Sequence, residues 1–395
     1  MQSNGPLTGL KVVEFAHMVM GPTVGLVLAD LGADVIKVEP IGGDKTRRLK
    51  GSGSGYFAMY NRNKKSICLD LKSERGKEVA KKLIADADVF VENFRPGALD
   101  KLGFGYAELS ADNEKLIYCS EKGFLAGPYE KRTALDEVAQ MMGGLAYMTG
   151  PPGRPLRAGA SVIDVTGGMF GAIAVLAALR ERDVTGKGQQ VQASLYETTA
   201  FLVGQHMAQY GVTGTPAAPM PARISAWAVY DVFDAKDGEK VFVGVVTDGQ
   251  WTKFCEAFGL DDWAKDESLA INNERVARRD EVIPRLRELF LTYDKSTLME
   301  KLETIGLPFA PIAKPEDLFE DPHLNAKGGL LEMELPEGNQ IKLPALPVQM
   351  GSGRPGLRNS PPKPGANTAD IMRELGYSEQ DIQDAMATGY AGSDE

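Results

Sequence analysis

Residues 10–39 read LKVVEFAHMVMGPTVGLVLADLGADVIKVE and contain two short apolar runs separated by a helix-forming segment. Leu10–Phe15 has the composition of a short buried strand. Gly21 and Pro22 then begin a helix, because proline fits the first helical turn, and Gly32 ends it. Asp34–Glu39 is the second strand. A strand, a helix and a strand within about 30 residues predict the opening of a parallel α/β sheet.

Further patterns continue this sheet through the first half of the chain. Strands are predicted at 67–71, 88–92, 115–120 and 189–193, and helices at 74–87, 134–147, 169–179 and 196–210. Alternation of strands with helices is typical of a parallel sheet. The sequence therefore predicts the α/β fold class, with residues 1–210 forming the N-terminal part of a large domain.

The second half of the chain has a different character. Gly211–Pro221 is rich in Gly, Pro, Thr and Ala, so we expect a linker at 211–224. Beyond it, the predicted strands 228–234 and 240–246 flank Lys236-Asp-Gly-Glu239, the pattern of a hairpin with a glycine turn. Amphipathic helices follow as far as residue 305. These patterns predict a small α+β domain at 225–325.

Composition excludes several classes of protein. The net charge of −10, from 44 basic and 54 acidic residues, argues against a protein that binds nucleic acid or a membrane surface as a whole. The three cysteines are scattered and the chain has only three histidines, so we expect neither a disulfide framework nor a metal site. No signal peptide or apolar run of about 18 residues is apparent, which favours a cytoplasmic protein without a membrane span.

Two glycine-containing turns and one strand end are candidate ligand sites. The turn Ala16–Gly21 lacks the G-x-G-x-x-G pattern of dinucleotide-binding folds, so Glu39 alone gives little support to a nicotinamide site. Gly51–Gly55 is followed by neither a helix nor a Lys-Ser/Thr pair, which favours a surface loop over a phosphate loop. Asn93–Gly97 follows a predicted strand, where open α/β sheets bind ligands, although a simple turn remains the alternative.

One carboxylate stands at the start of a buried helix. The stretch Arg157-Ala-Gly-Ala-Ser-Val-Ile-Asp164-Val-Thr-Gly-Gly-Met169 places Asp164 between an apolar pair and a Gly-Gly step. Asp164 could be a helix N-cap, because aspartate accepts hydrogen bonds from free backbone N–H groups. The other interpretation is a nucleophile that a glycine-lined turn directs into a pocket. Local sequence leaves both interpretations open.

An ordered set of segments resembles a known family, the class III CoA-transferases. The segments are Phe15–Pro22, Leu28–Glu39, Val91–Gly97, Gly127–Tyr129, Gly143–Gly150, Asp164 with Met169, and Leu375–Tyr377. The resemblance is to the group of formyl-CoA transferase and carnitine CoA-transferase, with the α-methylacyl-CoA racemases as relatives. It implies a Rossmann-like large domain built from both chain ends, completed by a return segment at 326–395, and an interlaced homodimer.

The resemblance also implies a chemistry. The family nucleophile corresponds to Asp164, which would form a covalent aspartyl-CoA thioester, with coenzyme A as a substrate rather than a tightly bound cofactor. Asp136 matches an acidic position near that nucleophile. Backbone N–H groups of Gly249, or of Gly167 and Gly168, could stabilise the tetrahedral intermediates. By position, CoA contacts are implied for Val19, Met20, Leu69, Lys72, Asn93, Phe94, Arg95, Lys101 and Thr133. Arg47 and Arg48 are added as candidates for the CoA phosphates.

Departures from the family pattern narrow the expected substrate. Val19 stands where formyl-CoA transferases have Gln, which places an oxalate pocket in doubt. Leu135 stands where racemases have His, so racemisation of a 2-methylacyl-CoA is the alternative rather than the first hypothesis. We expect a small dicarboxylate acceptor of the succinate, mesaconate, itaconate or citramalate type. Arg157, Arg132 or Arg223 could hold its second carboxylate, or could make structural ion pairs.

Overall fold

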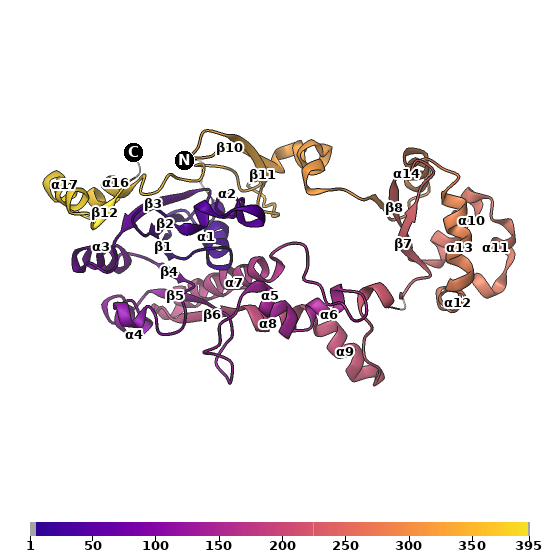
Figure 1. The fold of residues 1–395 in the computed structure, drawn as a ribbon, viewed down its shortest axis with the longest axis horizontal. Coiled ribbons are helices and arrows are strands. Elements are labelled where there is room, and N and C mark those ends of the chain that lie inside the picture. Colours follow the sequence, from indigo (N-terminus) through magenta and orange to yellow (C-terminus); the bar gives the residue numbers. More distant parts are fainter. Residues whose placement is uncertain (1–4, 224, 394–395) are drawn as a thin grey trace. The chain divides into compact units, whose positions relative to one another are not determined.

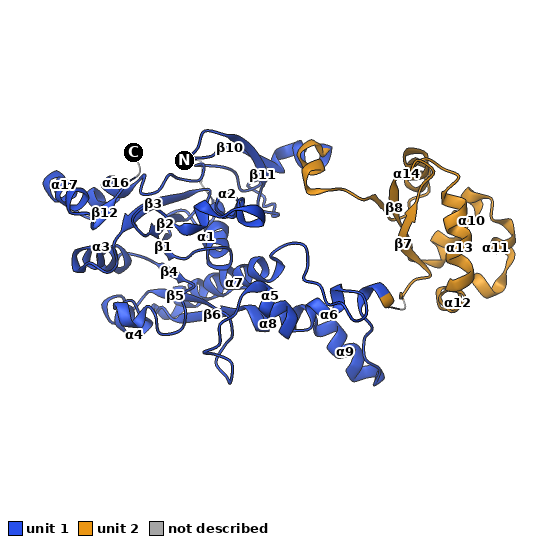
Figure 2. Cartoon of the chain, in the orientation of Figure 1, with its two compact units in different colours: residues 1–221, 322–395 blue, residues 222–321 orange. Residues whose placement is uncertain are grey.

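The computed structural model describes residues 5–223 and 225–393, which form two compact units. The first unit contains residues 1–221 and 322–395, and the second contains residues 222–321 (Figure 2). Each unit has its own core of buried apolar side chains. The two units are therefore described separately.

A seven-stranded sheet with the order β12-β3-β2-β1-β4-β5-β6 forms the centre of the first unit (Figure 1). Its parallel strands are β1 (Lys11–Phe15), β2 (Asp34–Glu39), β3 (Lys64–Leu69), β4 (Val89–Glu92), β5 (Ile117–Lys122) and β6 (Gln190–Ser194). The last strand, β12 (Ala391–Gly392), pairs antiparallel with β3. The predicted α/β class with a mostly parallel sheet is confirmed. The strand order reverses between β1 and β4, the position at which such sheets bind ligands.

Helices cover both faces of the sheet. Those of the first unit are α1 (Met20–Asp30), α2 (Tyr56–Tyr60), α3 (Glu74–Ala85), α4 (Tyr106–Asp112), α5 (Asp136–Met142), α6 (Leu145–Thr149), α7 (Val162–Thr185), α8 (Leu195–Leu202), α9 (Gly204–Thr213), α15 (Pro322–Asn325), α16 (Thr368–Glu374) and α17 (Glu379–Thr388). A separate antiparallel hairpin, β10 (Leu330–Glu334) and β11 (Gln340–Pro344), lies in the returning C-terminal segment.

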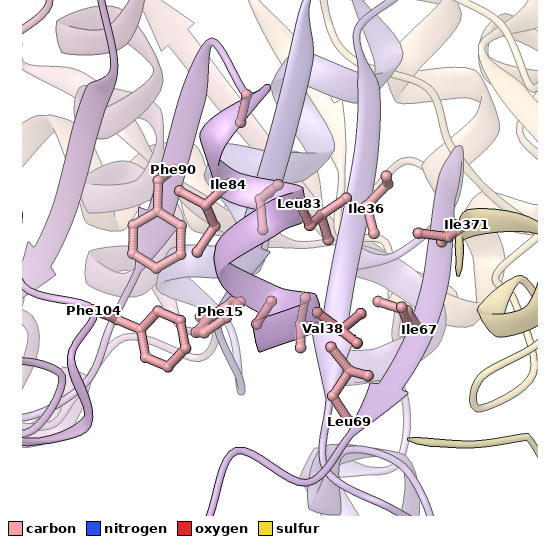
Figure 3. Packing of buried hydrophobic residues seen from close by; sticks show 14 of the residues in the cluster. Phe15, Ile36, Val38, Ile67, Leu69, Leu83, Ile84, Phe90, Phe104 and Ile371 are labelled. Carbon is pink, nitrogen blue, oxygen red and sulfur yellow. The ribbon is translucent and has the colours of Figure 1, made fainter. Parts of the chain in front are cut away.

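The apolar runs in the strands supply both faces of the sheet. Val13 belongs to the core cluster under α3, α4, α16 and α17, whereas its neighbour Val12 belongs to the cluster under α1 and α7. Successive side chains of a strand point to opposite faces, so a strand covered on both faces must be apolar throughout. Figure 3 shows Leu83 and Ile84 of α3 lying over Ile36 and Phe90 of the strands.

The returning C-terminal segment is bound to strand β3 by hydrogen bonds. The Ser66 N–H donates to Asn367 Oδ1 at 3.0 Å, and the Cys68 N–H donates to Thr368 Oγ1 at 3.2 Å. Residues about three hundred positions apart in the chain therefore share one sheet edge. The predicted linker begins within α9, which extends to Thr213.

The second unit is a small α+β arrangement. Its antiparallel sheet has the order β7-β8-β9, with β7 (Val229–Asp234), β8 (Lys240–Val245) and β9 (Phe309–Pro311). Its helices are α10 (Asp248–Phe258), α11 (Asp261–Lys265), α12 (Asn272–Ala277), α13 (Arg279–Phe290) and α14 (Lys295–Thr304). The hairpin predicted around Lys236-Asp-Gly-Glu239 is confirmed as β7 and β8.

Several predicted element boundaries were wrong. The helix predicted at 134–147 is two helices, because Gly143 and Gly144 interrupt it and Gly144 has a φ of +86°. The helix predicted at 196–210 is divided into α8 and α9 at Val203. The helix predicted at 169–179 is the much longer α7, which begins at Val162.

Helix α7 also bears on the membrane prediction. By length and composition alone, it is the one helix among the described residues that could cross a membrane. In the first unit it packs against α1 and β5 as part of the core. Only 39% of its most apolar window is buried, so part of an apolar helix surface is left uncovered by this chain.

Candidate active site

Asp164 lies in the first turn of α7, three residues after the N-cap Ser161. The side chain of Ser161 accepts no hydrogen bond from the N–H groups of the helix. Asp164 itself is helical, so the interpretation of Asp164 as an N-cap was wrong. The helix was predicted to begin at Met169, and the true start seven residues earlier moves Asp164 from the loop into the helix. A different carboxylate satisfies the helix N-terminus.

That carboxylate is Asp136, the first residue of α5, which is 6% exposed. Its Oδ2 accepts hydrogen bonds from the backbone N–H of Ile163 at 2.9 Å and of Asp164 at 3.1 Å. The first N–H groups of a helix have no partners within the helix, and the helix dipole favours a negative charge there. Asp136 thus caps α7 from a separate helix and fixes the backbone that carries Asp164.

Two further side chains complete the coordination of Asp136. Gln140 lies one turn later on α5, is fully buried, and donates from Nε2 to Asp136 Oδ1 at 2.6 Å. Its Oε1 accepts from the N–H of Ala158 at 2.8 Å, which ties the loop before α7 to α5. Arg157 Nη2 donates to the same Oδ1 at 3.1 Å. Gln140 was not predicted as a site residue, although its spacing of four residues from Asp136 was a usable signal.

The surroundings of Asp164 make its charge costly. Burial, followed by the negative charge of Asp136, raises the pKa of Asp164 to about 7, and the charge of Arg157 only partly opposes this shift. Burial and the charge of Asp164 likewise raise the pKa of Tyr60 on α2 to about 12, so its hydroxyl keeps its proton. The hydroxyl of Tyr56, one turn earlier, lies 3.3 Å from Ser161 Oγ. Neither tyrosine was predicted as a site residue.

Glycines in α7 bring this helix unusually close to α1. A Cβ added to Gly167 would lie 2.6 Å from the Met20 side chain, and one added to Gly168 would lie 2.4 Å from the Met20 carbonyl oxygen. Only glycine permits that approach. Their N–H groups lie inside α7, where they donate within the helix. The proposal that Gly167 and Gly168 stabilise an oxyanion was therefore wrong, and their role is packing.

The sheet brings several of the predicted CoA contacts together. Val19 and Met20 follow β1, and Asn93, Phe94 and Arg95 follow β4, so both groups lie where the strand order reverses. The two loops touch, because the His17 ring packs edge-on against Phe94 with centroids 5.7 Å apart. This shared edge of β1 and β4 is called the β1–β4 edge below. Val19 and Met20 are buried, so they can offer little but backbone and close packing.

Exposed cations and one polar residue make up the remaining contacts. Lys72 follows β3, Lys101 lies in a short 3₁₀ helix at 100–102, and Thr133 precedes α5. Among the described residues, the side chains of Lys72, Arg95 and Lys101 make no ion pair and are free for an anionic ligand. Leu69 is buried in the main core cluster.

Arg47 has a structural role in this chain. Its Nε and Nη2 donate to Glu39 at 2.8 and 2.6 Å, its Nη1 donates to the Pro362 carbonyl at 2.8 Å, and its guanidinium lies 3.6 Å above the Phe57 ring. A phosphate would have to displace these contacts. Burial alone would raise the pKa of Glu39, but the hydrogen bonds and charge of Arg47 hold it below the usual value. Glu39 is thereby unavailable to a ribose. Arg48 donates from Nη1 to the Gly42 carbonyl at 2.7 Å.

Gly249 and Arg223 lie in the second unit. Gly249 is exposed in the first turn of α10, directly after strand β8. Its predicted part in stabilising an oxyanion stays a prediction.

Arg132 precedes α5 in the first unit and stacks on Tyr129, 5.0 Å from the ring centroid. Arg157 pairs with Asp136, with Nη2 3.1 Å from Oδ1.

Known proteins of similar sequence all point to one family. The family description CoA-transferase family III matches residues 7–368. Over 383 residues the chain is 34% identical to a succinate–glutarate CoA-transferase of Agrobacterium fabrum, covering 94% of this chain and 96% of that protein. It is 32% identical to the human succinyl-CoA:glutarate CoA-transferase, covering 100% of this chain and 92% of that protein. A formyl-CoA:oxalate CoA-transferase of Bradyrhizobium diazoefficiens is 34% identical, with 97% and 96% covered.

Solved structures agree with the sequence comparison. A CAIB/BAIF family protein from Brucella suis superposes with a TM-score of 0.83 at 36% identity, covering 94% of this chain and all of that one. A hypothetical protein from Mycobacterium tuberculosis gives a TM-score of 0.81 at 28% identity, with 93% and 99% covered. The match to the family spans both units, and the chain therefore belongs to CoA-transferase family III and is an enzyme of that family.

Proposed function

We propose that this enzyme transfers CoA from an acyl-CoA thioester to a small dicarboxylic acid through a covalent intermediate on Asp164. The observation that carries this proposal is the position of Asp164. It is a partly buried carboxylate whose backbone is fixed by Asp136 and whose helix packs directly on α1, beside the β1–β4 edge. Asp136, and not Asp164, caps the N-terminus of α7.

The proposed reaction balances without water or an added reagent. The Asp164 carboxylate attacks the donor thioester carbonyl, the carbon–sulfur bond breaks, and a mixed anhydride and a CoA thiolate result. The thiolate attacks the Asp164 carbonyl, giving an aspartyl-CoA thioester and releasing the donor as a free carboxylate. The acceptor carboxylate then attacks the aspartyl thioester, and the thiolate it frees attacks the acceptor acyl carbon of the second anhydride. Asp164 is regenerated as a carboxylate.

The dicarboxylate acceptor is inferred from relatives and from one cation. Proteins about one-third identical to this chain are named for transfer between succinate and glutarate or to malate. Arg157 pairs with Asp136 through Nη2, while its Nη1 makes no hydrogen bond among the described residues and its side chain is 35% exposed. A guanidinium beside the nucleophile can hold a second carboxylate. Succinate, mesaconate, itaconate and citramalate fit this description.

We also propose that the enzyme is a homodimer. Large apolar side chains are exposed along α7, α8 and α9, including Ile173 at 58%, Phe201 at 71% and Met207 at 63%. Apolar patches of this kind mark interaction surfaces. A second copy of the chain that covers these helices would bury them, consistent with the interlaced dimer that the family resemblance implies.

Replacement of Asp164 by Asn should abolish transfer. The amide cannot act as the nucleophile, so we expect kcat for CoA exchange to fall by at least about a thousandfold. The measurement is succinyl-CoA consumption with glutarate as acceptor. Asp183→Asn, an exposed aspartate at the far end of the same helix, is the matched control and should keep normal activity. Full activity of the Asp164→Asn enzyme would end the proposal.

The pH profile should report the raised pKa of Asp164. Only the ionised carboxylate attacks, so kcat/KM should fall as pH decreases through about 7. Asp136→Asn removes the neighbouring negative charge and should move this acid limb to lower pH, whereas Glu137→Gln on the exposed side of α5 should not. An acid limb that moves to higher pH in Asp136→Asn would contradict this account.

The raised pKa of Asp164 also affects the stability of the fold. The folded protein holds the Asp164 proton up to pH about 7, while the unfolded chain releases it near 4. The stability contributed by this group is therefore lost as pH rises between those values.

Arg157 should discriminate between acceptors. Arg157→Gln removes the cation, so we expect KM for succinate to rise by about tenfold or more relative to KM for butyrate, which lacks the second carboxylate. The ratio of the two constants separates acceptor binding from any general damage at Asp136. Arg132→Gln is the comparison variant. Equal effects on both acceptors would remove Arg157 from this role.

The oligomeric state can be measured directly. Size-exclusion chromatography with light scattering should give twice the chain mass of 42.6 kDa. Phe201→Asp places a charge on the exposed apolar helices and should produce monomers, because burying an unpaired charge is costly. Leu291→Asp changes a comparably exposed leucine of the second unit and should leave the mass unchanged. A wild-type enzyme that is monomeric at micromolar concentration would refute the dimer.

A further inference from the structure

The loop between β1 and α1, residues 16–19, contains a backbone conformation that few side chains adopt. Met18 has a φ of +64°, in the left-handed region, and is not a glycine. A residue with a side chain costs about 1–2 kcal/mol in that region, so it persists only where the surroundings enforce it. Such strain is commonly found at ligand sites. This loop lies at the β1–β4 edge, directly after β1.

Three side chains from three other segments hold the loop. Lys37 Nζ, from β2, donates to the Ala16 carbonyl. Asn93, directly after β4, donates from Nδ2 to the His17 carbonyl at 2.8 Å and accepts at Oδ1 from the His17 N–H at 3.1 Å. Thr46 Oγ1 accepts from the Met18 N–H at 3.0 Å. The Ala16–His17 and His17–Met18 peptide groups are therefore both bound by side chains.

The residues that hold the loop are themselves fixed by buried charges. The Lys37 side chain is 1% exposed, and Nζ lies 3.3 Å from Glu14 and 3.2 Å from Asp44. Asp44 also accepts from the Thr46 hydroxyl at 2.8 Å. Buried ion pairs add little net stability compared with apolar residues of the same volume. Their geometric effect is different, because they fix Lys37 and Thr46 against the loop.

The hydrogen bonds of Asn93 differ from those expected of the CoA contact that the family resemblance implies. Both its carbonyl oxygen and its amide nitrogen are engaged by the same residue, His17. We propose that Asn93, Lys37 and Thr46 are positioning residues that hold loop 16–19 in the conformation that receives acyl-CoA, and that Asn93 acts through the His17 peptide. This inference rests on the proposed function and specifies how its CoA site is maintained.

The experiment combines binding, kinetics and a double-mutant cycle. In Asn93→Ala the loop loses two hydrogen bonds, so we expect the Kd of CoA by calorimetry and the KM of succinyl-CoA to rise by about tenfold. The kcat should change by less than about threefold, because Asp164 is untouched. Glycine tolerates positive φ, so Met18→Gly added to Asn93→Ala should recover most of the lost affinity when compared with Met18→Gly alone. A direct contact between Asn93 and CoA predicts no recovery and would overturn the proposal.

Amide hydrogen exchange tests the loop without any ligand. Asn93→Ala should speed exchange in the peptide that contains His17 and Met18, and unchanged exchange there would overturn the proposal. Asn113→Ala is the matched control, since that amide donates to the carbonyls of Ala85 and Ala87 at 3.3 and 2.8 Å, away from the loop. It should leave the Kd of CoA unchanged. A wild-type enzyme that binds no CoA would refute the proposed function and the acyl-CoA part of this inference, while exchange would still show whether Asn93 holds the loop.

Discussion

The buried carboxylate of Asp136 at the N-terminus of α7 is the interaction on which the site depends. It receives the N–H groups of Ile163 and Asp164, the amide of Gln140 and the guanidinium of Arg157. A local cap would satisfy the helix equally well but would link nothing else. Because Asp136 belongs to α5, the cap joins two helices, orders the loop between them and places a second carboxylate beside Asp164.

The close packing of α7 on α1 is a second constraint on the position of Asp164. Gly167 and Gly168 let α7 lie against Met20 at the start of α1, and α1 begins where the sheet order reverses. The candidate nucleophile lies on α7, and α7 is in direct contact with α1, which begins at the candidate CoA-binding edge. This arrangement has a cost in stability, because burial and Asp136 both disfavour the charged form of Asp164. Sites that keep such a charge give up stability for function.

The sequence predicted best what depends on neighbouring residues. The strand Asp34–Glu39 and the hairpin of β7 and β8 follow from apolar runs and a glycine turn, and both were placed well. What could not be predicted depends on contacts between residues that are distant in the chain. Arg47 donates to the carbonyl of Pro362, which lies 315 residues away, so this contact could not be predicted from the sequence around Arg47. The start of α7 was misplaced because its cap comes from Asp136, 28 residues before Asp164. The hydrogen bonds between Asn93 and His17 exist only once β1 and β4 are neighbours.

The covalent bond to Asp164 is the central claim, and mass spectrometry of the quenched enzyme tests it most directly. The enzyme is mixed with succinyl-CoA without an acceptor, quenched in acid and digested. The account predicts that the peptide containing residue 164 gains the mass of CoA minus one water, and that hydroxylamine removes this addition and leaves a hydroxamate on Asp164. An enzyme that transfers CoA while this peptide stays unmodified, or that carries the addition on another residue, would contradict the account.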